Sequence, residues 1–71
     1  MKVLSFSGSS AFVSIRYDEK IKTLTVDFTN GARYAYSDVP PDVVAELDKA
    51  SSKGAMFNAL VRGRYAERKL I

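Results

Sequence analysis

The dipeptide Asn30-Gly31 lies between two runs of strand-forming residues, and this arrangement constrains the fold more than any other feature of the sequence. Both residues tolerate the positive φ that tight hairpin turns require. The run before them, T-L-T-V-D-F, alternates polar and apolar side chains as a half-buried strand does. The run after them, residues 32 to about 36, is the expected partner strand. The sequence therefore predicts an antiparallel hairpin at this point.

The length of the hairpin loop decides which face of the sheet Tyr34 and Tyr36 occupy. With a two-residue loop, Arg33 lies on the apolar face and both tyrosines lie on the polar face. With a three-residue loop that ends at Gly31, the tyrosines lie opposite the apolar residues of the preceding strand. A slip of one residue exchanges the two faces, and burial of an arginine is unfavourable. We therefore favour the three-residue loop.

A third strand is expected before the hairpin, because residues 11–17 are rich in β-branched and aromatic side chains. Its alternation predicts Val13, Ile15 and Tyr17 on one face. The segment Val39-Pro40-Pro41 ends the last strand, since proline restricts the residue before it and suits the first position of a helix.

Two helices are expected after this point. The first begins near Pro41 and has an apolar stripe that includes Leu47, and Ser51-Ser52 separates it from the second. Phe57 belongs to the broad apolar face of the second helix, which Gly63 ends. The predicted fold is α+β, a three-stranded antiparallel β-meander followed by two α-helices packed on one sheet face.

The length of 71 residues leaves room for one core. We expect an N-terminal arm, residues 1–8, and a single domain, residues 9–71. No apolar run approaches the roughly 18 residues that span a bilayer, so no membrane partner is expected. The chain has no cysteine, which favours a cytoplasmic location.

The residue inventory argues against catalysis. The chain has neither cysteine nor histidine, which removes a thiol nucleophile, an imidazole base and the nitrogen and sulfur ligands of metals. The carboxylate pairs Asp18-Glu19 and Asp38 with Asp42 have no evident apolar pocket that would raise a pKa. We expect no enzymatic activity, no metal and no cofactor.

Positive charge is concentrated at the C-terminal end. Residues 53–71 carry five Lys or Arg and one Glu, a net of +4, whereas residues 1–52 carry six and seven, a net of −1, which gives +3 for the chain. The five cations are Lys53, Arg62, Arg64, Arg68 and Lys69. Such a segment attracts nucleic acid or an acidic protein face, although a solvated surface has the same composition.

Two motifs have both a functional and a structural interpretation. Ser52, Lys53 and Gly54 lie at the expected start of the second helix, where free N–H groups and the lysine would hold a phosphate. The alternative is a serine that caps the helix beside a glycine that allows close packing. Tyr34 and Tyr36 either stack bases or, as the favoured register implies, lie mostly in the core.

The order of these residues resembles the KTSC domain family, a short bacterial and phage module that is also found at the C-terminus of some lysyl-tRNA synthetases. The similarity runs from Ser9 through nearly all of the remaining chain. It rests on Ser9-Ser10, Tyr17-Asp18, the strand with Leu24, Val26 and Phe28, Asn30-Gly31, Tyr34-Ala35-Tyr36, Val39-Pro40, Leu47, Ser52-Lys53-Gly54, Phe57-Asn58, Val61-Arg62 and Tyr65.

The resemblance implies a small binding domain for which RNA is the suggested ligand. The motif positions that it carries over are Tyr34, Tyr36, Ser52, Lys53, Gly54, Asn58 and Arg62. Ala35 stands in the middle of the family's Y-x-Y, where a longer polar residue is expected, so a ligand contact from that position would be lost here.

Two functions therefore stand as hypotheses. The first is binding of RNA, either tRNA or single-stranded RNA, in which cations contact phosphates and the tyrosine rims lie near bases. Its candidate residues are Arg33, Tyr34, Tyr36, Ser52, Lys53, Gly54, Asn58, Arg62, Arg64, Arg68 and Lys69. The second is a protein-interaction module that self-associates or docks on a larger bacterial or phage protein. The first predicts that Lys53 and the tail arginines converge on one face, and the second predicts a contiguous apolar patch.

Overall fold

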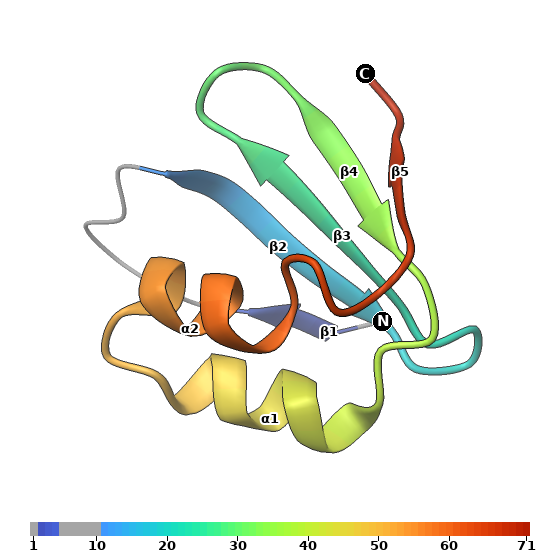
Figure 1. The fold of residues 1–71 in the computed structure, drawn as a ribbon, viewed down its shortest axis with the longest axis vertical. Helices are drawn as coiled ribbons and strands as arrows, with labels where there is room; N and C mark the ends of the chain where they lie inside the picture. Colours follow the sequence, from blue (N-terminus) through green and yellow to red (C-terminus); the bar gives the residue numbers. More distant parts are fainter. Residues whose placement is uncertain (1, 5–10) are drawn as a thin grey trace.

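The chain folds into an antiparallel sheet with two helices on one of its faces (Figure 1). The computed structural model describes residues 2–4 and 11–71. The sheet order β1-β2-β3-β4-β5 follows the sequence, so every strand pairs with its neighbour along the chain. The elements are β1 (Lys2–Leu4), β2 (Phe12–Asp18), β3 (Thr23–Phe28), β4 (Arg33–Tyr36), α1 (Pro41–Lys49), α2 (Lys53–Leu60) and β5 (Glu67–Lys69).

The α+β class with an antiparallel sheet and two helices is as predicted, but the sheet has five strands instead of three. The additional strands β1 and β5 lie at the two edges, and each is three residues long. A segment this short does not show the alternation by which a strand is recognised. Strand β1 falls within the expected arm 1–8, whose other residues, like Ser9-Ser10, lie outside the described part of the chain.

The hairpin between β3 and β4 has the three-residue loop that we favoured. Val26 lies opposite Tyr34, as that loop requires. The Gly31 N–H donates to the carbonyl of Phe28 at 3.1 Å, and Gly31 has a φ of +90°. Only glycine adopts that conformation without strain. The same register places Arg33 on the polar face of the sheet.

A bulge in β2 corrects one expectation from the sequence. Alternation predicted Val13 on the core face, yet its side chain is 66% exposed. The pairing with β3 shifts between Phe12 and Ser14, where one extra residue is inserted. Phe12 and Ile15 therefore share the core face although they are three residues apart.

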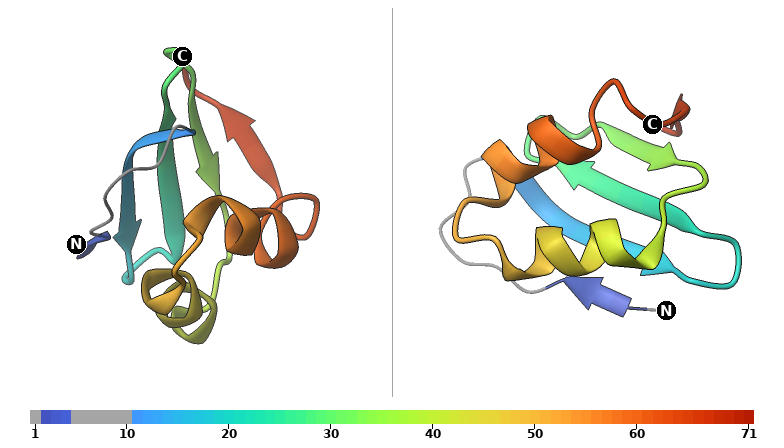
Figure 2. Two further views of the ribbon diagram at one scale, coloured as in Figure 1. Left: turned by 90° about the vertical axis from the view of Figure 1, so that its left-hand side faces the viewer. Right: turned by 60° about the horizontal axis from the view of Figure 1, so that its bottom comes forward.

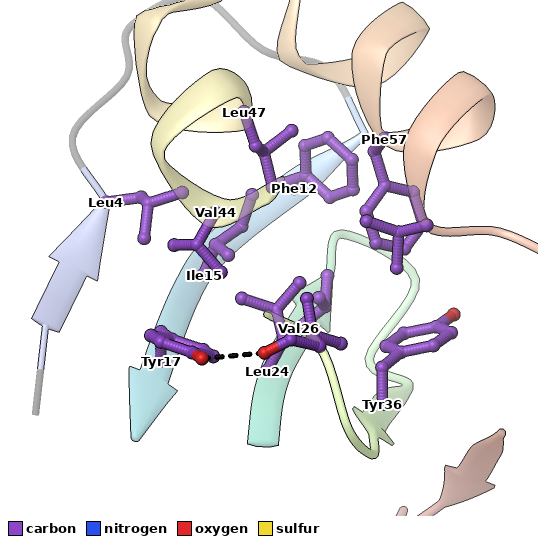
Figure 3. Close-up of a cluster of buried hydrophobic side chains, with 12 residues drawn as sticks. Leu4, Phe12, Ile15, Tyr17, Leu24, Val26, Tyr36, Val44, Leu47 and Phe57 are labelled. Atoms are coloured by element: carbon purple, nitrogen blue, oxygen red, sulfur yellow. Dashed lines mark hydrogen bonds between the residues drawn. The ribbon is translucent and has the colours of Figure 1, made fainter. Parts of the chain in front are cut away.

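The two helices form a layer over one face of the sheet (Figure 2), and the buried side chains of both layers make up the core (Figure 3). Phe57 of α2 lies edge-on to the rings of Phe12 and Tyr36, each at a centroid distance of 5.3 Å (Figure 3). The Tyr17 hydroxyl donates to the carbonyl of Val39 at 2.6 Å. This buried bond ties β2 to the segment that leads into α1.

The opposite face of the sheet, which we call the open face, is not covered by a helix of the described residues (Figure 2). Asp27 lies there and accepts hydrogen bonds from Arg33, from Ser14 at 2.7 Å and from Arg16 at 3.4 Å. The hydrogen bonds from Arg33 and Ser14 hold the pKa of Asp27 below its usual value. One carboxylate thus joins three side chains of β2 and β4.

We expect Asp27→Asn to lower the free energy of unfolding at pH 7 by about 1–2 kcal/mol, since a neutral amide replaces a carboxylate bonded to two arginines. The folded pKa is depressed, so the wild type keeps this stabilisation above the unfolded pKa of about 3.9 and loses it as the pH falls through the folded value. Urea unfolding between pH 7 and pH 2.5 measures both effects.

The difference in the free energy of unfolding between Asp27→Asn and the wild type should therefore shrink below about pH 4. Glu19→Gln, in the exposed turn after β2, is the control and should unfold like the wild type. A difference that stays constant across the whole pH range would contradict the assigned role of the carboxylate.

Candidate functional site

The residues predicted to bind nucleic acid divide among several places in the structure. One cleft is lined by six of them, namely Tyr34, Tyr36, Gly54, Asn58, Arg62 and Lys69. The others are Ser52 and Lys53 at the α1–α2 junction, Arg64 in the turn after α2, and Arg33 and Arg68 on the open face. We call the first place the aromatic cleft.

The aromatic cleft lies between α2 and the β4–β5 edge of the sheet, elements that can be followed in Figure 1. Its volume is about 370 Å³. That volume falls within the range of small-ligand sites, roughly 300–1,000 Å³. The cleft can therefore take a ligand the size of a nucleotide.

Aromatic rings form much of the cleft wall, from Phe12, Phe28, Phe57, Tyr34 and Tyr36. The Tyr34 and Tyr36 rings are stacked with their centroids 6.4 Å apart, and the rings of Phe28 and Tyr34 are nearly perpendicular with their centroids 5.7 Å apart. Tyr36 is buried, whereas Tyr34 is half-buried. The register thus puts both tyrosines on the core face, as expected, and leaves part of Tyr34 open to a ligand.

Charged and polar side chains form the rim. Asn58 and Arg62 come from α2 and the turn that follows it, whereas Glu67 and Lys69 come from β5. Residues two apart on a strand share a face, so Arg68 points to the open face instead. The ion pairs within residues 2–4 and 11–71 involve none of these side chains. Two unpaired cations and one carboxylate give the rim an excess of one positive charge.

The Tyr36 phenol lies within the electrostatic influence of both Glu67 and Arg62. Burial is the main cause that raises the pKa of Tyr36 to about 12. The negative charge of Glu67 adds to this rise, and the Arg62 charge acts in the opposite sense. The phenol therefore stays protonated at neutral pH. The cleft is thus lined by both a carboxylate acceptor, Glu67, and a guanidinium donor, Arg62.

The Lys53 ammonium is bonded within the fold. The residue is only 8% exposed, and its Nζ donates to the carbonyls of Asp48 at 2.9 Å and Ala50 at 3.2 Å, at the end of α1. The Ser52 Oγ accepts from the N–H of Ala55 at 3.4 Å. The structure therefore supports the capping interpretation of this motif, in which the lysine joins the two helices.

The expectation that Lys53 and the tail arginines converge on one face is wrong. Arg62 lies at the aromatic cleft. The Arg64 Nε donates to a carbonyl in the last turn of α2 at 2.7 Å. Arg68 pairs with Ala35 on the open face. The turn after α2 and the alternation of β5 separate cations that are close in sequence.

Four residues of the aromatic and charged lining, among others, were not predicted as site residues from the sequence. Phe12, Phe28 and Phe57 show the apolar spacing of core residues, and that pattern does not distinguish the wall of a cleft from an interior. Glu67 reaches the cleft because β5 pairs with β4, which places it opposite Tyr36. A three-residue strand is too short for the sequence to predict this pairing.

Two features of the described residues bear on membrane and metal binding. None of their helices has the length and apolar character needed to cross a bilayer. Within the same residues, no three Asp or Glu side chains gather as a metal site would need.

Comparison with known proteins gives concordant matches. The KTSC domain family matches residues 8–65. The lysine–tRNA ligase of Nostoc punctiforme is 41% identical over 56 residues, which are 79% of this chain and 10% of the ligase. An uncharacterised protein of Stutzerimonas stutzeri is 40% identical over 57 residues, 80% of each chain.

The crystal structure of a KTSC domain protein from Yersinia pestis has the same fold, with a TM-score of 0.88 and 28% sequence identity. The similarity covers 99% of this chain and 97% of that one. The chain spans only about one-tenth of the length of the lysine–tRNA ligases that it matches.

We expect Lys53→Met to lower the free energy of unfolding by about 1–3 kcal/mol, because two carbonyls at the end of α1 lose their donor. Lys49→Met, which removes an exposed lysine of the same helix, should cost less than about 1 kcal/mol. Urea unfolding of both variants makes the comparison. Unchanged stability of Lys53→Met, combined with weaker binding to RNA, would instead identify Lys53 as a phosphate ligand.

Proposed function

The chain belongs to the KTSC domain family, and from this premise we propose that it is a small non-catalytic domain that binds unpaired RNA in the aromatic cleft. The observation that carries the proposal is the convergence of aromatic side chains and unpaired cations in one cleft. RNA-binding sites combine these two features, since bases stack on rings while cations contact phosphates.

The aromatic side of the proposal concerns Tyr34. Its ring is half-buried and held in place by contacts with Phe28 and Tyr36, so it offers a fixed surface to a base. Stacking of one base on an aromatic side chain contributes about 1–3 kcal/mol. A base inside a duplex is already stacked, so the ligand would be a single strand or an unpaired segment such as a loop of tRNA.

The cationic side of the proposal concerns Arg62 and Lys69. They reach the cleft from different elements, the turn after α2 and the strand β5. A strand with one base in the cleft would have phosphates on both sides of that base. Each cation would meet one of these phosphates, and both contacts would weaken as salt increases.

The open face is less suited to a polyanion. Its Arg16 and Arg33 both contact Asp27, which neutralises part of their charge. A phosphate that approached these arginines would also meet the carboxylate. Arg68 is then the one cation of this face without an ion pair among the described residues, whereas the cleft rim has two, Arg62 and Lys69.

The relatives support RNA as the ligand class. A region similar to this chain forms about one-tenth of proteins named lysine–tRNA ligase. The match to the Stutzerimonas stutzeri protein, by contrast, covers 80% of that protein. We therefore propose a module that raises the affinity of an enzyme for RNA when it is joined to that enzyme, and that binds RNA by itself when it is a separate protein.

Fluorescence anisotropy with labelled single-stranded RNA and tRNA tests the proposal. We expect micromolar binding at about 50 mM salt and about tenfold weaker binding at 200 mM, as two or three phosphate contacts predict. The double variant Arg62→Ala/Lys69→Ala should bind at least about tenfold more weakly at the lower salt concentration.

The matched control is Lys20→Ala/Lys49→Ala, which removes the same charge from exposed positions outside the cleft. An equal loss of RNA affinity in the control would show that the binding is non-specific electrostatic attraction. No binding at about 50 mM salt would contradict the RNA proposal. It would favour the alternative, a protein-interaction module, for which the open face and the exposed Val3 beside it provide a surface.

A further inference from the structure

We infer that the aromatic cleft selects guanine among the four bases and that Glu67 is the residue that selects it. This inference rests on the proposed function and specifies the ligand of the same site. RNA binding alone leaves one feature of the cleft unexplained. A carboxylate lies at the rim of a cleft that is otherwise positive, between Arg62 and Lys69 in sequence.

The position of Glu67 is fixed by the backbone of the sheet. Pairing of β5 with β4 sets it opposite Tyr36, and both residues line the cleft. No ion pair within the described residues involves Glu67 or Arg62. Each ionised carboxylate has about four acceptor positions, so most of those on Glu67 remain for a ligand.

A carboxylate repels phosphate and accepts hydrogen bonds from N–H groups. The Watson–Crick edge of guanine carries two adjacent donors, N1–H and the N2 amino group, which match the two oxygens of a carboxylate. Adenine and cytosine each place one amino donor next to an acceptor nitrogen, and uracil has one N–H between two carbonyls. Guanine is therefore the base that offers Glu67 two donors without placing an acceptor against it.

Arg62 complements the remaining atom of the same edge. The O6 of guanine is an acceptor beside N1–H, and a guanidinium donates to such an oxygen. Glu67 and Arg62 both line the aromatic cleft, so the acceptor and the donor are available to one ligand. Tyr34 would hold the face of the base while these two side chains hold its edge.

A methylated ammonium ligand is the main chemical competitor, since aromatic rings with one carboxylate also bind such cations. The two cations of the rim oppose it. Arg62 and Lys69 outnumber Glu67, so the rim attracts an anionic ligand. A guanine nucleotide meets all three charges favourably. One phosphate contacts Lys69, the N1–H and N2 donors contact the carboxylate, and Arg62, which has five N–H donors, contacts both O6 and the second phosphate.

Short uridine-rich RNAs that carry a single central G, A or C, together with the all-uridine strand, test the inference by anisotropy at about 50 mM salt. The strand with G should bind at least about fivefold more tightly than the others, the lower end expected for a bidentate base contact. Glu67→Gln should abolish this preference, since its amide turns a donor toward the base. The affinity for the all-uridine strand should stay within about twofold of the wild-type value.

Glu46→Gln, on the exposed side of α1, is the matched control and should keep the preference for G. Thermal unfolding of both variants checks that each is folded. Equal affinity for all four strands in the wild type would overturn the inference and leave the proposed function intact. A preference for G that survives in Glu67→Gln would overturn the role of Glu67. Absence of binding to every strand would overturn the inference and the proposed function together.

Discussion

The register of the β3–β4 hairpin is the constraint on which the other features of the structure depend. The left-handed Gly31 closes a three-residue loop, and this sets Val26 opposite Tyr34. Both tyrosines of β4 consequently face the helices, and Arg33 faces Asp27 on the other side. A slip of one residue would bury an arginine and remove the aromatic wall of the cleft.

Alternation along β4 and β5 then distributes the chemistry between two surfaces. Lys69 joins the tyrosines at the cleft, whereas Arg68 lies with Ala35 on the open face. As a result, some of the positive side chains are bonded within the fold and others are free to meet a ligand. Lys53 is used within the fold and Arg33 contacts a carboxylate, while the cations of the cleft rim have no ion-pair partner among the described residues. The surplus of positive charge in the sequence is therefore a poor guide to the surface that meets a ligand.

The local signals in the sequence predicted the hairpin, the start of α1 at Pro41 and the serine cap of α2, because each depends on the conformational preferences of a few adjacent residues. The bulge at Val13 and the edge strand β5 depend on pairing between distant segments, so no local pattern announced them. About half of the candidate site could be predicted from local signals in the same way. The tyrosines and Arg62 stood out by type and spacing, whereas Glu67 acquires its place only from the sheet.

The measurement that tests the central claim most directly is a ¹H–¹⁵N NMR titration of the labelled domain with unlabelled single-stranded RNA. If the cleft is the binding site, the largest shift changes should fall on Asn58, Arg62 and Lys69 around its rim, while Arg16 and Thr25 on the open face stay unchanged. Shift changes centred on Arg16 and Thr25 would move the binding surface to the other side of the sheet and contradict the account.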